Sequence, residues 1–536
     1  MPLLIHHFLE NSADRFPDRE AVVHGSDRYT YAEIESRANQ IANWLLEQDL
    51  RKGDRVALLL RNSSLYVSSY YGILKAGGVA VPLNTGIGAN EIGEILMNCS
   101  PRVVISEPFF RERIEEIGRD DSSPWKLCLF MDWASSGVEA GKGINSWAPI
   151  GKSSSRRPSF LIGEEDLSSI VYTSGSTGRP KGVVLTHANI CANTLSIVSY
   201  LGLSGVDRCL VVLPFYYVYG KSLLNTHFAV GGSIIIDNRF AFPNAVLKTM
   251  IAERASGFAG VPSTYTILVK RSSAAKMSFP ALRYITQAGG HLPSEIKKAL
   301  PEIFKGKEIY IMYGATEASA RLSYLDPRDF ERKMHSIGKP IRGVEMKVVK
   351  DDGGEEGEIA VKGPNIMKGY WDDPEETEKV LKSGWYYTGD LGYVDDEGFF
   401  FLTGRRRDLI KVGIHKVSAI EIEEVLYRYP GVREAAVIGV PDEASGEAVK
   451  AIVVMENGAC VSKALLEYCS RNLPVYKVPK EIVFAEELPK NEAGKVLKQR
   501  LAELYCGNSC LRCESTGSLR RAQVGTESFF YTSEAK

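Results

Sequence analysis

Short apolar runs alternate with helical patterns along the first half of the chain, and this alternation constrains the fold more than any other feature. Residues 55–60 and 79–83 are apolar runs typical of buried strands. Residues 65–76, between them, have the pattern of a helix. A capping box, Thr30 with Glu33, opens an earlier helix. Strands that alternate with helices predict parallel βαβ units and therefore an α/β fold.

The chain has 536 residues, which is too long for one hydrophobic core, so two or more domains are expected. From about residue 345 the pattern changes to short β segments, and a compact mixture of strands and helices follows the basic cluster Gly404-Arg-Arg-Arg-Asp408. We predict a large N-terminal domain (1–404) with βαβ sheets and a small β subdomain, a hinge (405–407), a smaller α+β C-terminal domain (408–503) and an unstructured tail (504–536).

Composition excludes several classes of protein. The net charge is −1, with 44% hydrophobic and 24% charged residues, which does not indicate binding to nucleic acid or to an acidic membrane. The N-terminal residues lack the basic and apolar regions of a signal peptide. No apolar run reaches the roughly 18 residues of a membrane span. We therefore expect a cytoplasmic protein without a transmembrane segment.

The cysteines divide into two groups. Six of the nine lie in apolar or mixed segments and are predicted to be core thiols of a reducing compartment; they are Cys99, Cys128, Cys191, Cys209, Cys460 and Cys469. The other three, Cys506, Cys510 and Cys513, have a C-x3-C-x2-C spacing that could hold an iron–sulfur cluster. A tail without strand or helix periodicity is preferred, because no fourth ligand or surrounding fold is visible.

Residues 172–183 read Y-T-S-G-S-T-G-R-P-K-G-V and follow an apolar run. Hydroxyl side chains and glycines form the centre of this stretch: Thr173, Ser174, Gly175, Ser176, Thr177 and Gly178. Successive backbone N–H groups in such a turn bind anions, and Lys181 adds a positive charge. The spacing of a Walker A loop is absent. The stretch predicts a phosphate-binding loop, although an ordinary turn between strands has a similar composition.

Other polar residues follow predicted strands or turns. Thr316 and Glu317, in Tyr313-Gly-Ala-Thr-Glu317, pair a hydroxyl with a carboxylate, which suits Mg²⁺. Asp390 follows a tight turn and could accept hydrogen bonds from ribose hydroxyls. Lys495 lies on a turn of the predicted small domain, where an exposed lysine by itself indicates only solubility. Tyrosines within 213–220 and small residues within 287–290 could border an open volume.

Taken together, these motifs resemble the adenylate-forming superfamily of acyl-CoA synthetases, luciferases and amino-acid adenylation domains. The resemblance runs from about residue 8 to residue 503, with the motifs in the family's order. It implies that the N-terminal domain carries the acyl pocket and the nucleotide, and that the small C-terminal domain is mobile and closes over them. Arg407 falls at the hinge position.

The resemblance also implies roles for individual residues. The ATP-binding residues would be Thr173, Ser174, Gly175, Ser176, Thr177, Gly178, Lys181, Tyr313, Gly314, Thr316, Asp390, Arg405 and Lys495. Lys495, Thr316 and Glu317 would be catalytic, and Thr173 and Glu317 would lie at the metal ion. The acyl pocket would be formed by Tyr217, Gly220, Val261, Gly289, Gly290, Gly314 and Ala315. The loop that meets the thiol acceptor would contain Lys411, Gly413, His415 and Lys416.

The implied activity is ATP- and Mg²⁺-dependent conversion of a carboxylic acid to an acyl-AMP, followed by transfer to a thiol. Coenzyme A is the preferred acceptor, and phosphopantetheine on an acyl carrier protein is the alternative. Near the acceptor loop the sequence departs from the family pattern, because Gly413 stands one position early and Ala419 replaces a proline. Tyr217 occupies a position that is often histidine.

The class of acid is argued from the pocket residues. Residues 213–230 contain no Asp or Glu to pair a substrate ammonium, so a simple carboxylic acid is favoured over an amino acid. Gly289, Gly290 and Ala315 leave room for an alkyl chain, which favours a medium- or long-chain fatty acid. An aryl acid fits the tyrosines nearly as well. No feature of the sequence favours a luciferase-like oxygenase. The presence of Lys495, Glu317 and Asp390 argues against an inactive homologue that only binds a nucleotide or a carrier.

Overall fold

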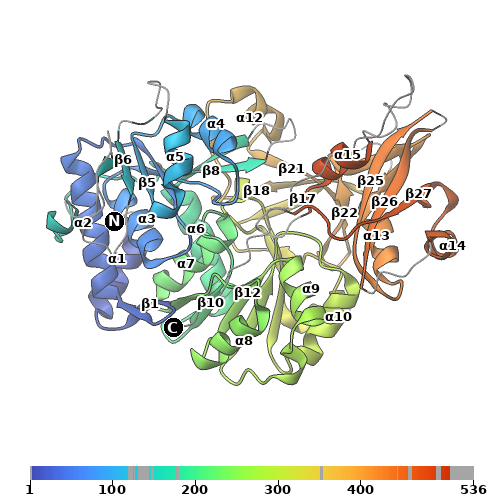
Figure 1. The fold of residues 1–536 in the computed structure, drawn as a ribbon, viewed down its shortest axis with the longest axis horizontal. Coiled ribbons are helices and arrows are strands. Elements are labelled where there is room, and N and C mark those ends of the chain that lie inside the picture. Colours follow the sequence, from blue (N-terminus) through green and yellow to red (C-terminus); the bar gives the residue numbers. More distant parts are fainter. Residues whose placement is uncertain are drawn as a thin grey trace, which may run out of the picture.

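The computed structural model describes residues 3–118, 125, 127–130, 144–145, 150–174, 180–350, 354–443, 445–456, 462–490 and 496–506. Figure 1 shows a large α/β body and a smaller lobe formed by the C-terminal elements. This confirms the predicted fold class. In the described part of the chain, no helix is both long and apolar enough to cross a bilayer.

One sheet of the large body has the order β16-β15-β14-β13-β12-β10-β11-β1-β2 among the described strands. Its strands are β1 (Glu20–His24), β2 (Asp27–Thr30), β10 (Arg208–Val211), β11 (Ser233–Ile236), β12 (Gly257–Gly260), β13 (Tyr284–Gln287), β14 (Glu308–Tyr313), β15 (Ser323–Leu325) and β16 (Lys339–Pro340). The strands from β14 through to β1 are parallel, whereas β2, β15 and β16 pair antiparallel. The carboxyl ends of β13 and β14 therefore meet at one edge, where ligands of α/β sheets collect.

The second sheet has the order β19-β9-β8-β4-β3-β5-β6-β7. Its strands are β3 (Arg55–Leu59), β4 (Val79–Pro82), β5 (Val103–Ser106), β6 (Leu127–Phe130), β7 (Ile144–Asn145), β8 (Leu167–Ser174), β9 (Pro180–Thr186) and β19 (Gly369–Tyr370). The strands from β8 through to β7 are parallel, as the alternation predicted. By contrast, β8 and β9 form an antiparallel hairpin.

Helices cover the sheets and fill the space between them (Figure 1). They are α1 (His7–Arg15), α2 (Tyr31–Glu47), α3 (Ser64–Lys75), α4 (Ala89–Cys99), α5 (Arg111–Ile117), α6 (His187–Leu201), α7 (Val218–Val230), α8 (Pro243–Ala252), α9 (Pro262–Arg271), α10 (Ser294–Ile303), α11 (Phe330–Lys333) and α12 (Pro374–Val380). The largest buried cluster draws side chains from both sheets and from α1, α2, α3, α6 and α7. The capping box of Thr30 and Glu33 is confirmed at the start of α2.

A small antiparallel sheet completes the large body. It contains β17 (Glu345–Lys350), β18 (Gly357–Lys362), β20 (Leu381–Lys382), β21 (Trp385–Val394) and β22 (Phe400–Arg405). These strands are the short β segments that the sequence predicted from about residue 345.

The C-terminal lobe is built on a separate sheet with α13 (Ala419–Tyr427), α14 (Ser462–Asn472) and α15 (Lys498–Cys506). The strands of this sheet are β23 (Leu409–Val412), β24 (His415–Ser418), β25 (Val432–Asp442), β26 (Gly446–Met455) and β27 (Glu481–Phe484). Helix α15 extends past residue 503, where the tail was predicted to begin, and 507–536 lie outside the described residues. The domain limits and the hinge at Arg407 stay predictions.

Ser418 is the N-cap residue of α13, but its side chain accepts no hydrogen bond from the backbone N–H groups of the first helical turn. Its hydroxyl instead donates to the Thr403 carbonyl oxygen at 2.5 Å, across the junction of the two lobes. The side chain thus makes a contact between the lobes and no local cap.

Five of the six predicted core thiols, Cys99, Cys128, Cys191, Cys209 and Cys469, are buried and free. Cys460, Cys510 and Cys513 lie outside the described residues, and Cys506 ends α15.

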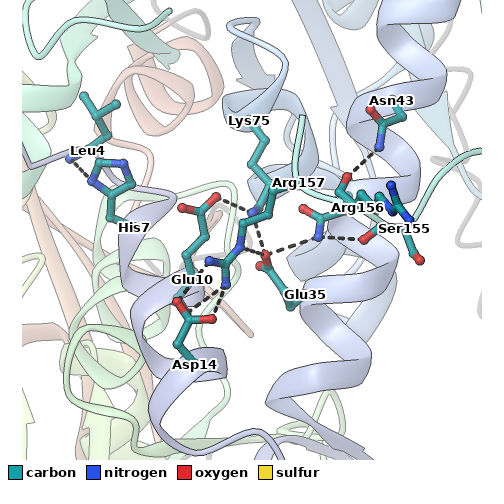
Figure 2. A network of polar contacts seen from close by, with 11 residues as sticks. Leu4, His7, Glu10, Asp14, Glu35, Asn43, Lys75, Ser155, Arg156 and Arg157 are labelled. Carbon is teal, nitrogen blue, oxygen red and sulfur yellow. Dashed lines mark hydrogen bonds and ion pairs between the residues drawn. The ribbon is translucent and has the colours of Figure 1, made fainter. Parts of the chain in front are cut away.

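Figure 2 shows a network of charged side chains that ties the N-terminal helices together. Lys75, at the end of α3, has a side chain that is only 1% exposed and contacts Glu10 of α1 at 2.5 Å and Glu35 of α2 at 2.9 Å. Arg157 also contacts Glu35, and it pairs with Asp14 of α1, both at 2.7 Å. Each buried carboxylate therefore has a cation beside it, which is the condition for burying charge.

Candidate functional site

The predicted phosphate loop lies at the tip of the β8–β9 hairpin. Thr173 pairs with Lys181 in the register of the two strands. Ser174 ends β8, and the tip residues Gly175, Ser176, Thr177 and Gly178 lie outside the described residues. The antiparallel pairing on both sides holds the ends of the loop together. The phosphate contacts of the tip stay a prediction.

Lys181 has a described environment. Its ammonium pairs with Glu376 of α12, and this contact lowers the pKa of the Glu376 carboxyl. The same ammonium lies 5.3 Å from the ring centroid of Tyr370 in β19. Sequence reasoning missed both partners. Glu376 lies in a helix-start pattern after Pro374, and nothing local relates that pattern to a lysine 195 positions earlier.

Glu317 lies next to the same tyrosine. The Tyr370 hydroxyl donates to Glu317 Oε1 at 3.0 Å, and Met367 N–H donates to the Glu317 carbonyl oxygen at 2.8 Å. Tyr370 therefore contacts both Lys181 and Glu317 and brings the two predicted motifs together. Thr316 begins the short 3-10 helix η4 (Thr316–Ala318) that carries Glu317. These side chains offer hard oxygen ligands, so the donor set fits Mg²⁺ bound together with phosphate.

A second group of predicted residues surrounds Asp390, which is 4% exposed. Tyr313 donates its hydroxyl to Asp390 Oδ2 at 2.6 Å, and Arg405 Nε lies 2.6 Å from Oδ1. Burial and the Asp390 charge both raise the pKa of Tyr313. Burial lowers the pKa of Arg405, but the charge of Asp390 together with those of other neighbouring groups outweighs it, and the pKa is raised. The carboxylate is thus held in place, as a group that accepts ribose hydroxyls requires.

The predicted acyl-pocket residues border α7 and the ends of the parallel strands. Tyr217 is the N-cap residue of α7. Gly220 and Gly314 are sites of close backbone approach, because an added Cβ would lie 2.1 Å from the Pro214 carbonyl oxygen and 1.8 Å from that of Ala320, respectively. Gly289 has a φ of 89°, which strains any other residue. The remaining members of the predicted pocket are Val261, which precedes α9, Gly290, which follows Gly289, and Ala315, which precedes η4.

The predicted acceptor loop is the β23–β24 hairpin of the C-terminal lobe. Lys411 lies in β23, and His415 and Lys416 lie in β24. Gly413 has a φ of 60° in the turn, so the early position of this glycine meets a real backbone need. The His415 ring stacks on Tyr476 at a centroid distance of 4.0 Å. Arg407, at the predicted hinge, lies 3.6 Å from the Asp408 carboxylate.

The two lobes contact each other through α13. Glu424 of α13 pairs with His291, and it accepts a hydrogen bond from Ser294 N–H at 3.2 Å. Burial opposes ionisation of Glu424, but the His291 contact and the hydrogen bonds from Ser294 together outweigh it and lower the pKa of the carboxyl to about 2. Lys270 of α9 donates to the Val432 carbonyl oxygen at 2.9 Å. These contacts hold the lobe in the arrangement of Figure 1.

A buried lysine without a hydrogen-bond partner among the described residues lies close to this site, with its ammonium 5.4 Å from the ring centroid of Tyr70. Lys221, on α7, is 3% exposed, and its Nζ has no hydrogen-bond partner among the described residues. It faces a small cavity whose polar lining residues are Asn193, Thr194, Ser222, Asn225 and Ser319. Burial lowers the pKa of Lys221 to about 7.

We expect Lys221→Met to stabilise the protein by about 1–4 kcal/mol, because it replaces an uncompensated buried cation with an apolar side chain. The lysine pKa is about 7 when folded and 10.5 in its unperturbed form. The unfolded chain therefore holds more protons between these values, and wild-type stability gains from rising pH. The advantage of the variant should be largest below pH 7 and should shrink towards pH 10.5. Urea denaturation at several pH values measures it.

Lys297→Met is the matched control for this prediction. Lys297 is also 3% exposed, and burial lowers its pKa to about 8, but its Nζ donates to the Met334 carbonyl oxygen at 2.9 Å. Removing the Lys297 ammonium leaves the Met334 carbonyl oxygen without this hydrogen bond, so the gain in stability should be smaller than for Lys221→Met. A Lys221→Met variant that is less stable than wild type, or equally stabilised at all pH values, would contradict the prediction.

Two family models match the chain, one in the large body and one in the C-terminal lobe. Residues 9–371 match the AMP-binding enzyme family, and residues 421–495 match the AMP-binding enzyme C-terminal domain. The chain is 34% identical to the feruloyl-CoA synthase of an Amycolatopsis species, over 90% of this chain and 95% of the relative. It is 32% identical to the long-chain-fatty-acid–CoA ligase of Bacillus subtilis, over 93% of this chain and 94% of the relative.

Solved structures give the same result. The anthranilate CoA ligase AuaEII, solved in complex with anthranoyl-AMP, superposes with a TM-score of 0.87 at 28% identity, covering 95% of this chain and 98% of that one.

Proposed function

Because the chain belongs to the AMP-binding enzyme family and is an acid–thiol ligase of the acyl-CoA synthetase type, we propose that it activates a carboxylic acid with ATP to form an acyl-AMP and then transfers the acyl group to coenzyme A. The observation that carries this proposal is the pair of clusters at the edge of the large body. One joins Lys181 and Glu317 through Tyr370. The other holds Asp390 between Tyr313 and Arg405.

The two clusters suit the two ends of a nucleotide. Asp390 would accept the ribose hydroxyls, with Arg405 beside it. Lys181 and the hydroxyl-rich loop would hold the β- and γ-phosphates. Lys181 would have to exchange Glu376 for phosphate oxygens, which is reasonable because both are anions. Thr173 and Glu317 would hold Mg²⁺, and a bound magnesium ion would neutralise phosphate charge.

The chemistry explains the cations. In the first step, a carboxylate oxygen of the acid attacks the α-phosphorus of ATP, the bond to the bridging oxygen breaks, and pyrophosphate leaves. Both reactants are anions, so positive groups must lie where the charge develops. Lys181 would neutralise the departing phosphates, and Lys495 would contact the carboxylate and the α-phosphate.

In the second step, a thiol sulfur attacks the acyl carbon and AMP leaves. Coenzyme A is proposed as the acceptor because the relatives named above are a CoA synthase and a CoA ligase, and the β23–β24 loop, with Lys411 and Lys416, would meet it. A phosphopantetheine arm on a carrier protein offers the same thiol and is the alternative. Lys495, which lies outside the described residues, would have to leave before the thiol arrives, and a C-terminal lobe that moves would allow this.

The acid is proposed to enter beside α7. The preference for a fatty acid rests on the small residues Gly289, Gly290 and Ala315. The relatives named above include both a feruloyl-CoA synthase and a fatty-acid ligase, at similar identities of 34% and 32%. The class of acid therefore depends on the side chains that form the pocket walls.

Carboxylate-dependent exchange of pyrophosphate into ATP tests the proposal. We expect exchange with at least one acid from a panel of fatty acids of graded length, benzoates, cinnamates and dicarboxylic acids. Addition of coenzyme A, or of a holo-carrier protein in a parallel reaction, should then give the thioester. Absence of exchange with every acid in the panel would refute the proposed activity.

A further inference from the structure

Arg321 is a buried cation for which the described structure provides no anion. The residue is 3% exposed. Its Nε contacts Met312 Sδ at 3.2 Å, its Nη1 donates to the Ala320 carbonyl oxygen at 3.2 Å, and its Cζ lies 4.0 Å from the ring centroid of Tyr219. Among the described residues it forms no ion pair with a carboxylate. A guanidinium stays charged in proteins, so its burial against an aromatic face and neutral acceptors is only partly compensated.

A strained turn places this side chain. After η4, Ser319 has a φ of 60° and Ala320 a φ of 153°, a region that residues other than glycine rarely adopt. Asn365, from a distant segment, holds the turn in place. Ser319 Oγ donates to the Asn365 carbonyl oxygen at 2.8 Å, and Asn365 Nδ2 donates to the Arg321 carbonyl oxygen at 2.9 Å. Strain of this kind destabilises the fold and concentrates at functional sites.

The turn adjoins the proposed acyl pocket. Gly314 packs directly against the Ala320 carbonyl, and Gly220 follows Tyr219 on α7. The Tyr219 hydroxyl donates to the Thr286 carbonyl oxygen at 3.0 Å, near the end of β13. Arg321 therefore lies between α7 and the ends of β13 and β14.

An unbranched alkyl chain would leave the guanidinium without an anion. A carboxylate would instead accept two parallel N–H bonds from it. The protein does not provide this carboxylate from α7, because residues 213–230 contain no Asp or Glu. The same helix carries Lys221, another buried cation without a carboxylate partner in the described structure. The surroundings of the pocket are thus cationic, and their anion has to come with the substrate.

We propose that Arg321 binds a second carboxylate at the far end of the acid, so that the substrate is a dicarboxylic acid activated at one end and held at the other. This inference rests on the proposed function, because it assumes that an acid is adenylated in the pocket beside α7. Arg321 would then determine substrate specificity, and a dicarboxylic acid replaces the fatty acid that the sequence favoured.

The test compares matched acids and matched variants. Dicarboxylic acids of graded length are assayed beside the monocarboxylic and ω-hydroxy acids of the same length, by pyrophosphate exchange into ATP. The wild-type enzyme should favour the best dicarboxylic acid over its monocarboxylic partner by about 100-fold or more in kcat/KM. Arg321→Met should remove this preference by lowering kcat/KM for the dicarboxylic acid alone. Arg321→Lys, which keeps the charge but not the planar fork, should retain part of it.

Lys297→Met serves as the control, because it removes a buried cation on α10 that donates to the Met334 carbonyl oxygen, and it should retain the preference. The inference is overturned if wild type prefers monocarboxylic acids, if ω-hydroxy acids match the dicarboxylic acids, or if Lys297→Met and not Arg321→Met abolishes the preference. Equal loss on all acids, with a lower melting temperature, would assign Arg321 a structural role instead. Exchange with monocarboxylic acids alone refutes this inference but supports the proposed function, whereas no exchange with any acid refutes both.

Discussion

Replacing Lys495 with alanine is expected to lower the rate of acid adenylation by about 100-fold to 1,000-fold, while thioester formation from a synthetic acyl-AMP stays nearly unchanged. The physical reason is that the Lys495 ammonium would neutralise the approaching carboxylate and the α-phosphate only in the first step. In the second step the mixed anhydride between the acid and AMP is already formed, and the thiol needs the space. Pyrophosphate exchange measures the first step, and release of AMP from acyl-AMP and coenzyme A measures the second.

Lys490→Ala is the matched control for Lys495. Lys490 lies in the same sequence motif, but it pairs with Glu434 at 2.6 Å within the C-terminal lobe. It also forms a backbone bridge with Val496, which ties together the two residues that flank Lys495 and its neighbours. Loss of the Lys490 side chain should leave both steps close to wild type. Equal loss of both steps in Lys495→Ala would contradict the role assigned to Lys495.

Replacing Lys75 with methionine is expected to destabilise the protein by about 3–5 kcal/mol, because it leaves the carboxylates of Glu10 and Glu35 partly or fully buried without their common cation. Glu35 would keep Arg157 at 2.7 Å, but Glu10 would lose its ion-pair partner of 2.5 Å (Figure 2). Urea denaturation at neutral pH measures the loss.

The same substitution at Lys221 provides the comparison. Both lysines are almost fully buried, at 2% and 3% exposure, and both lie on helices of the central layer. Lys75 has two carboxylate partners, whereas Lys221 has none among the described residues. Lys75→Met should therefore destabilise the protein and Lys221→Met should stabilise it. Changes of the same sign in both variants would show that burial, rather than pairing, determines the result.

The α/β architecture could be predicted from local patterns in the sequence. Alternating strands and helices predicted the parallel strands of both large sheets, and the Thr30 capping box was found where it was expected. Such features depend on residues a few positions apart, so they are readable in one sequence. By contrast, the hydrogen bond of the Ser418 hydroxyl to the Thr403 carbonyl oxygen joins elements of the two lobes and could not be read from the local pattern.

In the candidate site, too, some features could be read from the sequence and others only from the fold. The residue types of Lys181, Glu317 and Asp390 indicated their proposed roles from the sequence, since phosphate, Mg²⁺ and ribose each require particular side-chain atoms. Only Glu317 follows a strand, whereas Lys181 lies within β9 and Asp390 within β21. The grouping of Lys181 with Glu317 through Tyr370 was decided only by the tertiary structure, which brings β9, β19 and η4 together.

The two buried lysines and Arg321 show the limit most clearly. In sequence, Lys75, Lys221 and Arg321 are cations within helical or turn segments, and nothing local separates a paired charge from an unpaired one. Their effects depend on distances of 2.5–2.9 Å to carboxylates that lie 40 and 65 residues away, or on the absence of such carboxylates from the described surroundings. Sequence alone thus determined the fold class and the chemistry of acid activation. Only the tertiary structure decided which buried charges the protein itself balances, as at Lys75, and which have no carboxylate among the described residues, as at Lys221 and Arg321.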